Sequence, residues 1–326
     1  NLIKVNILNK RLLLSTAIAG FFYAGFASAE LSLDANLELD TDVADTANTG
    51  SKYDQNGFVE LNAYGKHQTG EYFVAAKGSV RLQSDGDDNV EVRDVYVQLG
   101  NNVWDAQLGR FEAVNLFPLA KDTVISHAGG VSVYEANKVR GRAGDDGGQI
   151  AFHLNASDNL KFEIATIFGD DDTAGDNGSA VSGIRPAVTW STDGVSLTAG
   201  YERVNYDLSA GGEVDQNGFG ITANFDVGEA NFNVAASRME DETTDQEVNS
   251  YVANVVYGGF GAGVIFSEED NATGVDPEVT TTYLAYTMPL FDIESATVTF
   301  AGSFSTADDV ADDESTALRM RLNYTF

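Results

Sequence analysis

The chain has no cysteine, only 4 prolines in 326 residues, and 19 basic residues against 50 acidic ones. The absence of cysteine excludes disulfide cross-links and a thiol nucleophile, so rigidity has to come from hydrogen-bonded backbone. The formal net charge of −31 argues against nucleic acid as a partner, because both molecules would be strongly negative. With 33 glycines and so few prolines, the composition is typical of strands joined by turns.

Long hydrophobic runs are also missing, except near the amino terminus. There, Lys4, Lys10 and Arg11 precede an apolar run from Leu12 to Phe26, and the small residues Ala27 to Ala29 follow it. This pattern predicts a secretory signal peptide over residues 1–29, removed on the general secretory route, and a mature domain over residues 30–326. A membrane-anchoring helix is the alternative, but the run is short for a full span and ends in a small-residue cleavage pattern.

The rest of the chain consists of segments of about ten residues in which apolar and polar side chains alternate. In "NLKFEIATIF", Leu160, Phe162, Ile164 and Phe168 share one face, and "FGITANF" repeats the pattern from Phe219. Alternation with a period of two predicts β-strands with one apolar face and one face of small polar residues. The last segment, "LRMRLNYTF", alternates in the same way and finishes on an aromatic ring, which suits the edge of a membrane.

The predicted connections alternate in length along the chain. Short connections fall near residues 69–70, 100–102, 157–159, 192–194, 227–229, 258–259 and 289–294, and longer acidic ones cover residues 41–56, 85–89, 112–148, 169–180, 207–215, 239–247, 268–279 and 306–314. A soluble sandwich has no reason to sort its connections by length, whereas an outer-membrane barrel has short turns at one end and long loops at the other. The sequence therefore predicts an all-β, antiparallel up-and-down transmembrane barrel of about sixteen strands, which leaves an aqueous pore.

The third long connection, residues 112–148, is out of proportion and has an apolar middle, so we expect it to pack against something. With the signal peptide, the strand count, the segment "AQLGRFE" before this loop and the terminal Phe326, the chain resembles the general porins of Gram-negative outer membranes. The resemblance implies that the third loop folds into the barrel and that three copies form a homotrimer. It also implies passive diffusion of small hydrophilic solutes and ions, in an outer membrane of lipid and lipopolysaccharide.

In such porins, acidic residues of the third loop face a basic cluster on the barrel wall and create a transverse field. The candidates for the basic side of the constriction are Lys77, Arg81, Arg93, Lys138, Arg140, Arg142, Arg319 and Arg321, and those for the loop acids are Glu112, Asp122 and Glu135. Arg185 is a further inward candidate, and the facing of Arg93 stays open because "VEVRDVYVQL" does not alternate cleanly. The alternative for the wall cations is a solvated lumen charge that merely avoids lipid, and for the loop acids it is external exposure. The three cations of the loop, Lys138, Arg140 and Arg142, could form the basic wall themselves or clamp the loop to it.

The long connections hold most of the excess negative charge. One of them, "GDDDTAGDNG", contains Asp170, Asp171, Asp172 and Asp176, which have the composition of a weak calcium site without the spacing of an EF-hand. Solvation is the alternative, and no other cofactor is expected. An acidic vestibule concentrates cations, so we expect a weak preference for cations.

The sequence leaves other functions open beside a general diffusion channel. The main alternative is a channel selective for an oligosaccharide or an anionic solute, although no ladder of lumen-facing aromatics is evident in the sequence. The three histidines, His67, His127 and His153, lie beside no nucleophile signature, so we expect no enzyme activity. A receptor role of the outer loops stays open.

Overall fold

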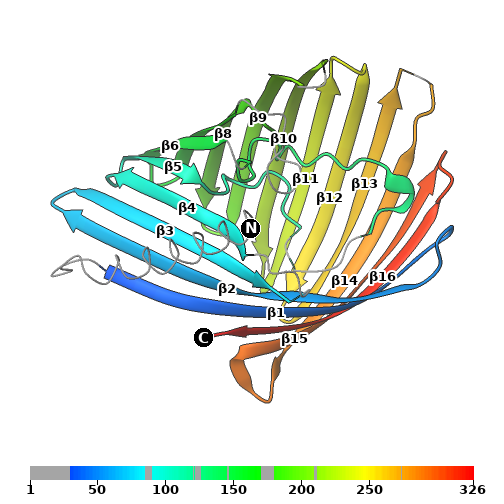
Figure 1. The fold of residues 1–326 in the computed structure, drawn as a ribbon, viewed down its shortest axis with the longest axis horizontal. Helices are drawn as coiled ribbons and strands as arrows, with labels where there is room; N and C mark the ends of the chain where they lie inside the picture. The colour runs from blue at the N-terminus through cyan, green and yellow to red at the C-terminus, as the bar shows by residue number, and fades with distance from the viewer. Residues whose placement is uncertain are drawn as a thin grey trace, which may run out of the picture.

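The computed structural model describes residues 30–84, 90–119, 121, 126–144, 147–169, 180–208, 211–272 and 274–326. Within these ranges, sixteen antiparallel strands form one closed barrel, in which every strand pairs with its neighbours in sequence and β1 also pairs with β16 (Figure 1). The predicted all-β up-and-down barrel is therefore confirmed. No helix in the described part of the chain is both long and apolar enough to cross a bilayer.

The strands run as follows: β1 (Glu30–Thr46), β2 (Lys52–Thr69), β3 (Tyr72–Gln83), β4 (Val90–Gly100), β5 (Trp104–Arg110), β6 (Gly148–Ser157), β7 (Leu160–Phe168), β8 (Gly183–Thr192), β9 (Val195–Asp207), β10 (Glu213–Val227), β11 (Ala230–Asp241), β12 (Gln246–Tyr257), β13 (Phe260–Asn271), β14 (Glu278–Leu290), β15 (Ile293–Asp308) and β16 (Glu314–Thr325). A 3-10 turn, η1 (Ala128–Gly130), follows β5.

The alternating pattern sorts the side chains between the two faces of the barrel wall. Phe162 and Ile164 are exposed on the outside, whereas Ala165, on the other face of the same strand, is fully buried toward the lumen. Aromatic rings gather on the outside near the short turns, where Phe260 and Tyr286 lie 4.4 Å apart and Tyr324 and Phe326 lie 5.2 Å apart, measured between ring centroids. Such rows of aromatic residues are typical of the interface between membrane and water.

The prediction of a long first connection over residues 41–56 was wrong, because β1 extends to Thr46 and β2 begins at Lys52. Polar residues continue the ladder there, with Asp42 opposite Asp54. Strands can continue to pair beyond the apolar band of the barrel, where their side chains are polar. Composition alone therefore predicts a loop that is too long at both ends. The sorting of short and long connections holds, since the short turns all lie at one end of the barrel.

The described residues of the third loop, 111–119, 121, 126–144 and 147, lie inside the barrel (Figure 1). Its apolar side chains form several clusters with lumen-facing residues of the wall. Phe117 contacts Val252, Ile265 and Tyr283, and all four are almost completely buried. The hydrophobic core of the molecule therefore lies between this loop and one side of the barrel, and the loop narrows the lumen as predicted.

Candidate functional site: the lumen and its third loop

The third loop packs directly against two glycines on the lumen face of the wall, Gly218 and Gly220, which we call the loop's bed. A Cβ atom at Gly218 of β10 would lie 1.5 Å from the Tyr134 hydroxyl oxygen, and one at Gly220 would lie 2.7 Å from Cβ of Ala136. No side chain could occupy these positions without moving the loop. The segment "QNGFGI" therefore has no side chain at the two wall positions where the loop comes closest.

A buried carboxylate tethers the middle of the loop to this bed. Glu202 of β9 accepts a hydrogen bond of 2.5 Å from the Tyr134 hydroxyl and bonds of 3.1 and 3.0 Å from the backbone N–H groups of Lys138 and Val139. Burial, reinforced by the adjacent Glu202 charge, raises the pKa of Tyr134 well above its ordinary value, so the hydroxyl remains a donor. Arg185 of β8 is completely buried and donates to the carbonyl oxygens of Ala136 (3.1 Å) and Val114.

Hydroxyl side chains of β14 to β16 hold the part of the loop around η1. Ser126 shares a hydrogen bond of 2.7 Å with Ser315, and the N–H of Ala128 donates to Ser305 at 2.9 Å. His127 Nδ1 lies 2.8 Å from the Thr281 hydroxyl. Burial lowers the pKa of His127 below its ordinary value of 6.5, which favours the neutral imidazole. The loop is thus attached to strands between β7 and β16, and also to β4 through Arg142 and Asp94, and it leaves the wall from β1 to β3 open to the lumen.

The predicted basic residues of the strands all face the lumen, on β3, β4 and β16. Their carboxylate partners lie on the wall itself: Lys77 bonds Asp94 (2.6 Å), Arg81 bonds Glu60 (2.6 Å), Arg93 bonds Glu91 (2.6 Å), Arg319 bonds Asp42 (2.6 Å), and Arg321 bonds Asp40 (2.6 Å) and Glu38 (3.1 Å). The basic wall is therefore neutralised by acids of the same wall.

A β-bulge explains why the facing of Arg93 could not be read from the sequence. The register between β3 and β4 shifts where Arg93 and Asp94 lie opposite the single residue Ser79. An extra residue in one strand turns two consecutive side chains to the same face. Val92 and Val95 on either side are exposed on the outside, so both Arg93 and Asp94 lie on the lumen side.

The charged residues predicted in the third loop bond to one another and to the wall. Arg142 bonds Asp94 of β4 at 2.8 Å and Glu112 at 3.1 Å, and Arg140 lies 3.3 Å from Glu112. A basic residue of the loop thus meets an acid of the wall here, which is the reverse of the polarity that the resemblance implies.

The other predicted loop residues take different places. Glu135 accepts from Asn137 at 3.4 Å, and burial raises the pKa of its carboxyl. Lys138 is joined to the wall through its backbone, as described above. Asp122 and the proposed calcium residues Asp170, Asp171, Asp172 and Asp176 lie outside the described residues. Within the described ranges, no cluster of three or more histidine or acidic side chains could hold a metal ion.

Four aromatic side chains face the lumen on β2 to β4, and the alternation in the sequence places only one of them, Phe73, on a polar face. Tyr64 and Tyr96 both lie directly opposite the lumen-facing Lys77, and Phe58 lies opposite Glu38. Phe73 shares the face of Lys77, four residues further along β3. Residues that are paired across antiparallel strands share a face, so the register reveals what the isolated segments did not. Arg81 lies over the ring of Phe58 at 3.8 Å and Lys66 over that of Phe73 at 4.6 Å. The ring of Tyr96 contacts that of Phe111.

This barrel, closed by sixteen strands and narrowed by an inserted loop, is the architecture of a porin. The family described as porin-like glycoporin RafY matches the chain over residues 24–322, and the chain belongs to this family. Its family and fold are those of an outer-membrane channel for passive diffusion. No curated protein matches the sequence.

Several solved porin structures have the same fold at low sequence identity. An anion-selective porin from Comamonas acidovorans aligns with a TM-score of 0.72 at 15% identity, over 92% of this chain and 100% of that chain. The outer membrane channel DcaP of Acinetobacter baumannii gives 0.67 at 13% identity, over 93% and 99%. OmpT of Vibrio cholerae, in its trimer form, gives 0.60 at 13% identity, over 91% and 99%.

Proposed function

We propose that the chain is a porin of a Gram-negative outer membrane that lets small hydrophilic solutes and ions diffuse passively, with a weak preference for cations. The observation that carries the preference is the pairing of the basic wall: Arg81, Arg319 and Arg321 each bond a carboxylate of the wall itself. A paired charge attracts a passing anion weakly. The chain's excess of 50 acidic over 19 basic residues then sets the field that ions meet.

We further propose the assembly and the partners that accompany this function. The trimer form of the Vibrio cholerae protein supports a homotrimer, and the apolar outer face with its aromatic rows supports contact with membrane lipid and lipopolysaccharide.

The basic, apolar and small residues at the amino terminus support cleavage of residues 1–29 after export. Calcium binding at Asp170, Asp171, Asp172 and Asp176 is supported by composition alone, and catalysis forms no part of the proposal.

A second candidate is a channel selective for an oligosaccharide. The lumen-facing rings of Phe58, Tyr64, Phe73 and Tyr96 favour it, because sugar rings stack on aromatic faces, and the description of the matched family as a glycoporin points the same way. Selectivity for an anionic solute through the basic wall has less support, since that wall is neutralised.

Ion selectivity and sugar block separate these candidates. We would reconstitute the purified protein in planar bilayers and measure the reversal potential across a potassium chloride gradient, followed by addition of oligosaccharides of increasing length. A cation-shifted reversal potential without block supports the diffusion porin. Saturable block that weakens in Tyr96→Ala supports the oligosaccharide channel. An anion-shifted reversal potential contradicts the proposed preference.

A further inference from the structure

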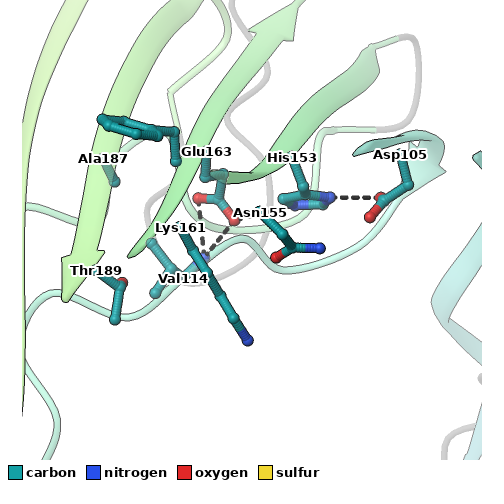
Figure 2. Close-up of a pocket in the computed structure, with 9 residues that line it drawn as sticks. Asp105, Val114, His153, Asn155, Lys161, Glu163, Ala187 and Thr189 are labelled. Carbon is teal, nitrogen blue, oxygen red and sulfur yellow. Dashed lines mark hydrogen bonds and ion pairs between the residues drawn. The ribbon is translucent and has the colours of Figure 1, made fainter. Parts of the chain in front are cut away.

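An alcove of about 350 Å³ opens beside the first part of the third loop, in the half of the lumen nearer the short turns (Figure 2). Strands β5 to β8 form its walls, and Val114 of the loop borders it. At roughly 30 Å³ for each water molecule, it has room for about a dozen waters. A small organic molecule therefore fits beside the main path.

The two carboxylates of the alcove are already neutralised. Asp105 lies 2.6 Å from Nδ1 of His153, and Glu163 lies 3.3 Å from Nε2 of the same ring. Carboxylate oxygens accept hydrogen bonds, so an imidazole that serves both groups donates through both nitrogens and carries a positive charge. Glu163 also accepts from the Val114 N–H at 3.1 and 3.2 Å and lies 3.5 Å from Arg185.

Lys161 of β7 supplies the charge that remains available to a solute. Its side chain lines the alcove, and in Figure 2 its ammonium group points away from the Glu163 carboxylate. Within the described part of the chain, Lys161 has no hydrogen-bond or ion-pair partner. The Asn155 amide and the Thr189 hydroxyl lie on the same wall and provide polar groups for the rest of a bound molecule.

We propose that this alcove is a binding subsite for small organic oxyanions that cross the channel, with Lys161 as the group that holds them. The inference rests on the proposed function, because Lys161 and Glu163 are on the lumen face of β7 and a solute that crosses the channel would meet them there. The volume favours an acid of a few carbon atoms over a bare ion, and the unpaired ammonium favours an anion over a neutral sugar. A channel with an overall preference for cations would thus hold anions briefly near its short-turn end.

The test compares two lysines that face the same half of the lumen. Lys66 of β2 lies near the opposite short turn, outside the alcove, with its ammonium 4.6 Å from the centre of the Phe73 ring. Lys161→Gln and Lys66→Gln change the charge of the lumen equally. In single-channel recordings in potassium chloride, succinate is added at increasing concentration, with phosphate and glucose as parallel probes.

We expect succinate to reduce the current saturably in the unmodified protein. The half-saturating concentration should rise about tenfold in Lys161→Gln and change less than about twofold in Lys66→Gln. Lys161→Arg should retain the effect, which also shows that the site tolerates substitution. A similar effect of phosphate would identify the shared oxyanion charge as the feature recognised.

Three results would overturn the subsite. These are the absence of saturable block by succinate, an equal shift in both glutamine variants, and block by glucose at the same concentration as succinate. Each of them leaves the channel itself intact, since potassium chloride still carries current. A protein that inserts but conducts no ions would instead remove the proposed function, and the subsite with it.

Discussion

Arg321 on the last strand and Asp40 on the first are joined by two parallel hydrogen bonds of 2.6 Å, from Nε to Oδ1 and from Nη2 to Oδ2. The two residues are direct partners in the register. Arg319 and Asp42, two residues along the same strands, are also partners and bond at 2.8 and 2.6 Å. The seam that closes the barrel is thus held by two bidentate ion pairs. Because the guanidinium fork matches a carboxylate in one alignment, the pairs also fix the register of closure.

Removal of one member of the seam should destabilise the barrel. Arg321→Ala removes both short hydrogen bonds to Asp40, which is 3% exposed, and leaves that carboxylate only its 3.2 Å contact with Nη1 of Arg319, so the free energy of unfolding should fall by about 3 kcal/mol. Urea unfolding of the refolded protein in detergent measures this change. Arg238→Ala breaks exposed pairs with Glu240 and Glu247 on the outer surface and should cost less than about 1 kcal/mol. Equal losses in the two variants would show that the seam has no special role.

Loss of the Glu202 carboxylate should loosen the third loop. Glu202→Ala removes the acceptor for Tyr134, Lys138 and Val139 at once. We expect a larger and noisier single-channel current and faster proteolysis within the loop, while the barrel stays folded. The matched control is Glu240→Ala, an acid of a nearby strand that faces outward. Identical current noise in the two variants would contradict the tether.

A methyl group added to the wall at Gly218 should also loosen the third loop. Gly218→Ala places Cβ 1.5 Å from the Tyr134 hydroxyl oxygen, so the ring has to leave its place beside Glu202. The expected results are a change in conductance and a lower midpoint of thermal unfolding. Gly78→Ala is the control, because a Cβ there meets nothing within 4 Å. If Gly218→Ala behaves like Gly78→Ala, the loop does not lie on the bed as described.

The attachment of the loop at His127 should weaken in acid. Burial lowers the pKa of His127 below 6.5, so a detached loop binds the proton more readily than an attached one. Stability from this contact is therefore complete above about pH 6.5 and is lost as the pH falls toward the lowered pKa. Glu135 acts in the opposite direction, because burial raises its pKa and its protonation favours the packed loop.

The comparison that isolates His127 is the difference between the unmodified protein and His127→Gln. Loop proteolysis followed from pH 7.5 to pH 5 should accelerate more in the unmodified protein, because glutamine bonds Thr281 without titrating. Parallel pH profiles in the two proteins would exclude His127 as the sensitive group.

The arrangement of the strands could be predicted from local patterns, but the partners inside the lumen could not. The alternation around Phe162 and Phe219 involves residues that are neighbours in the sequence, so it can be read directly. The same is true of the lengths of the turns. The Glu202 tether joins residues that are 63 to 68 positions apart, and no local signal marks it. The bulge at Arg93 and Asp94 interrupts the period of two, so the facing of β4 required the register.

Because the chain has no cysteine, a single introduced thiol reports on whether its position lies on the water-filled path. Tyr64→Cys places a thiol on the open wall, and Ser250→Cys places one beneath the loop, where Ser250 is completely buried and bonds the Tyr134 N–H at 2.8 Å. A charged, thiol-specific reagent added during single-channel recording should reduce the current through Tyr64→Cys and leave Ser250→Cys unchanged. Rapid modification of Ser250→Cys with no effect on Tyr64→Cys would place the water-filled path on the other side of the loop and contradict the account.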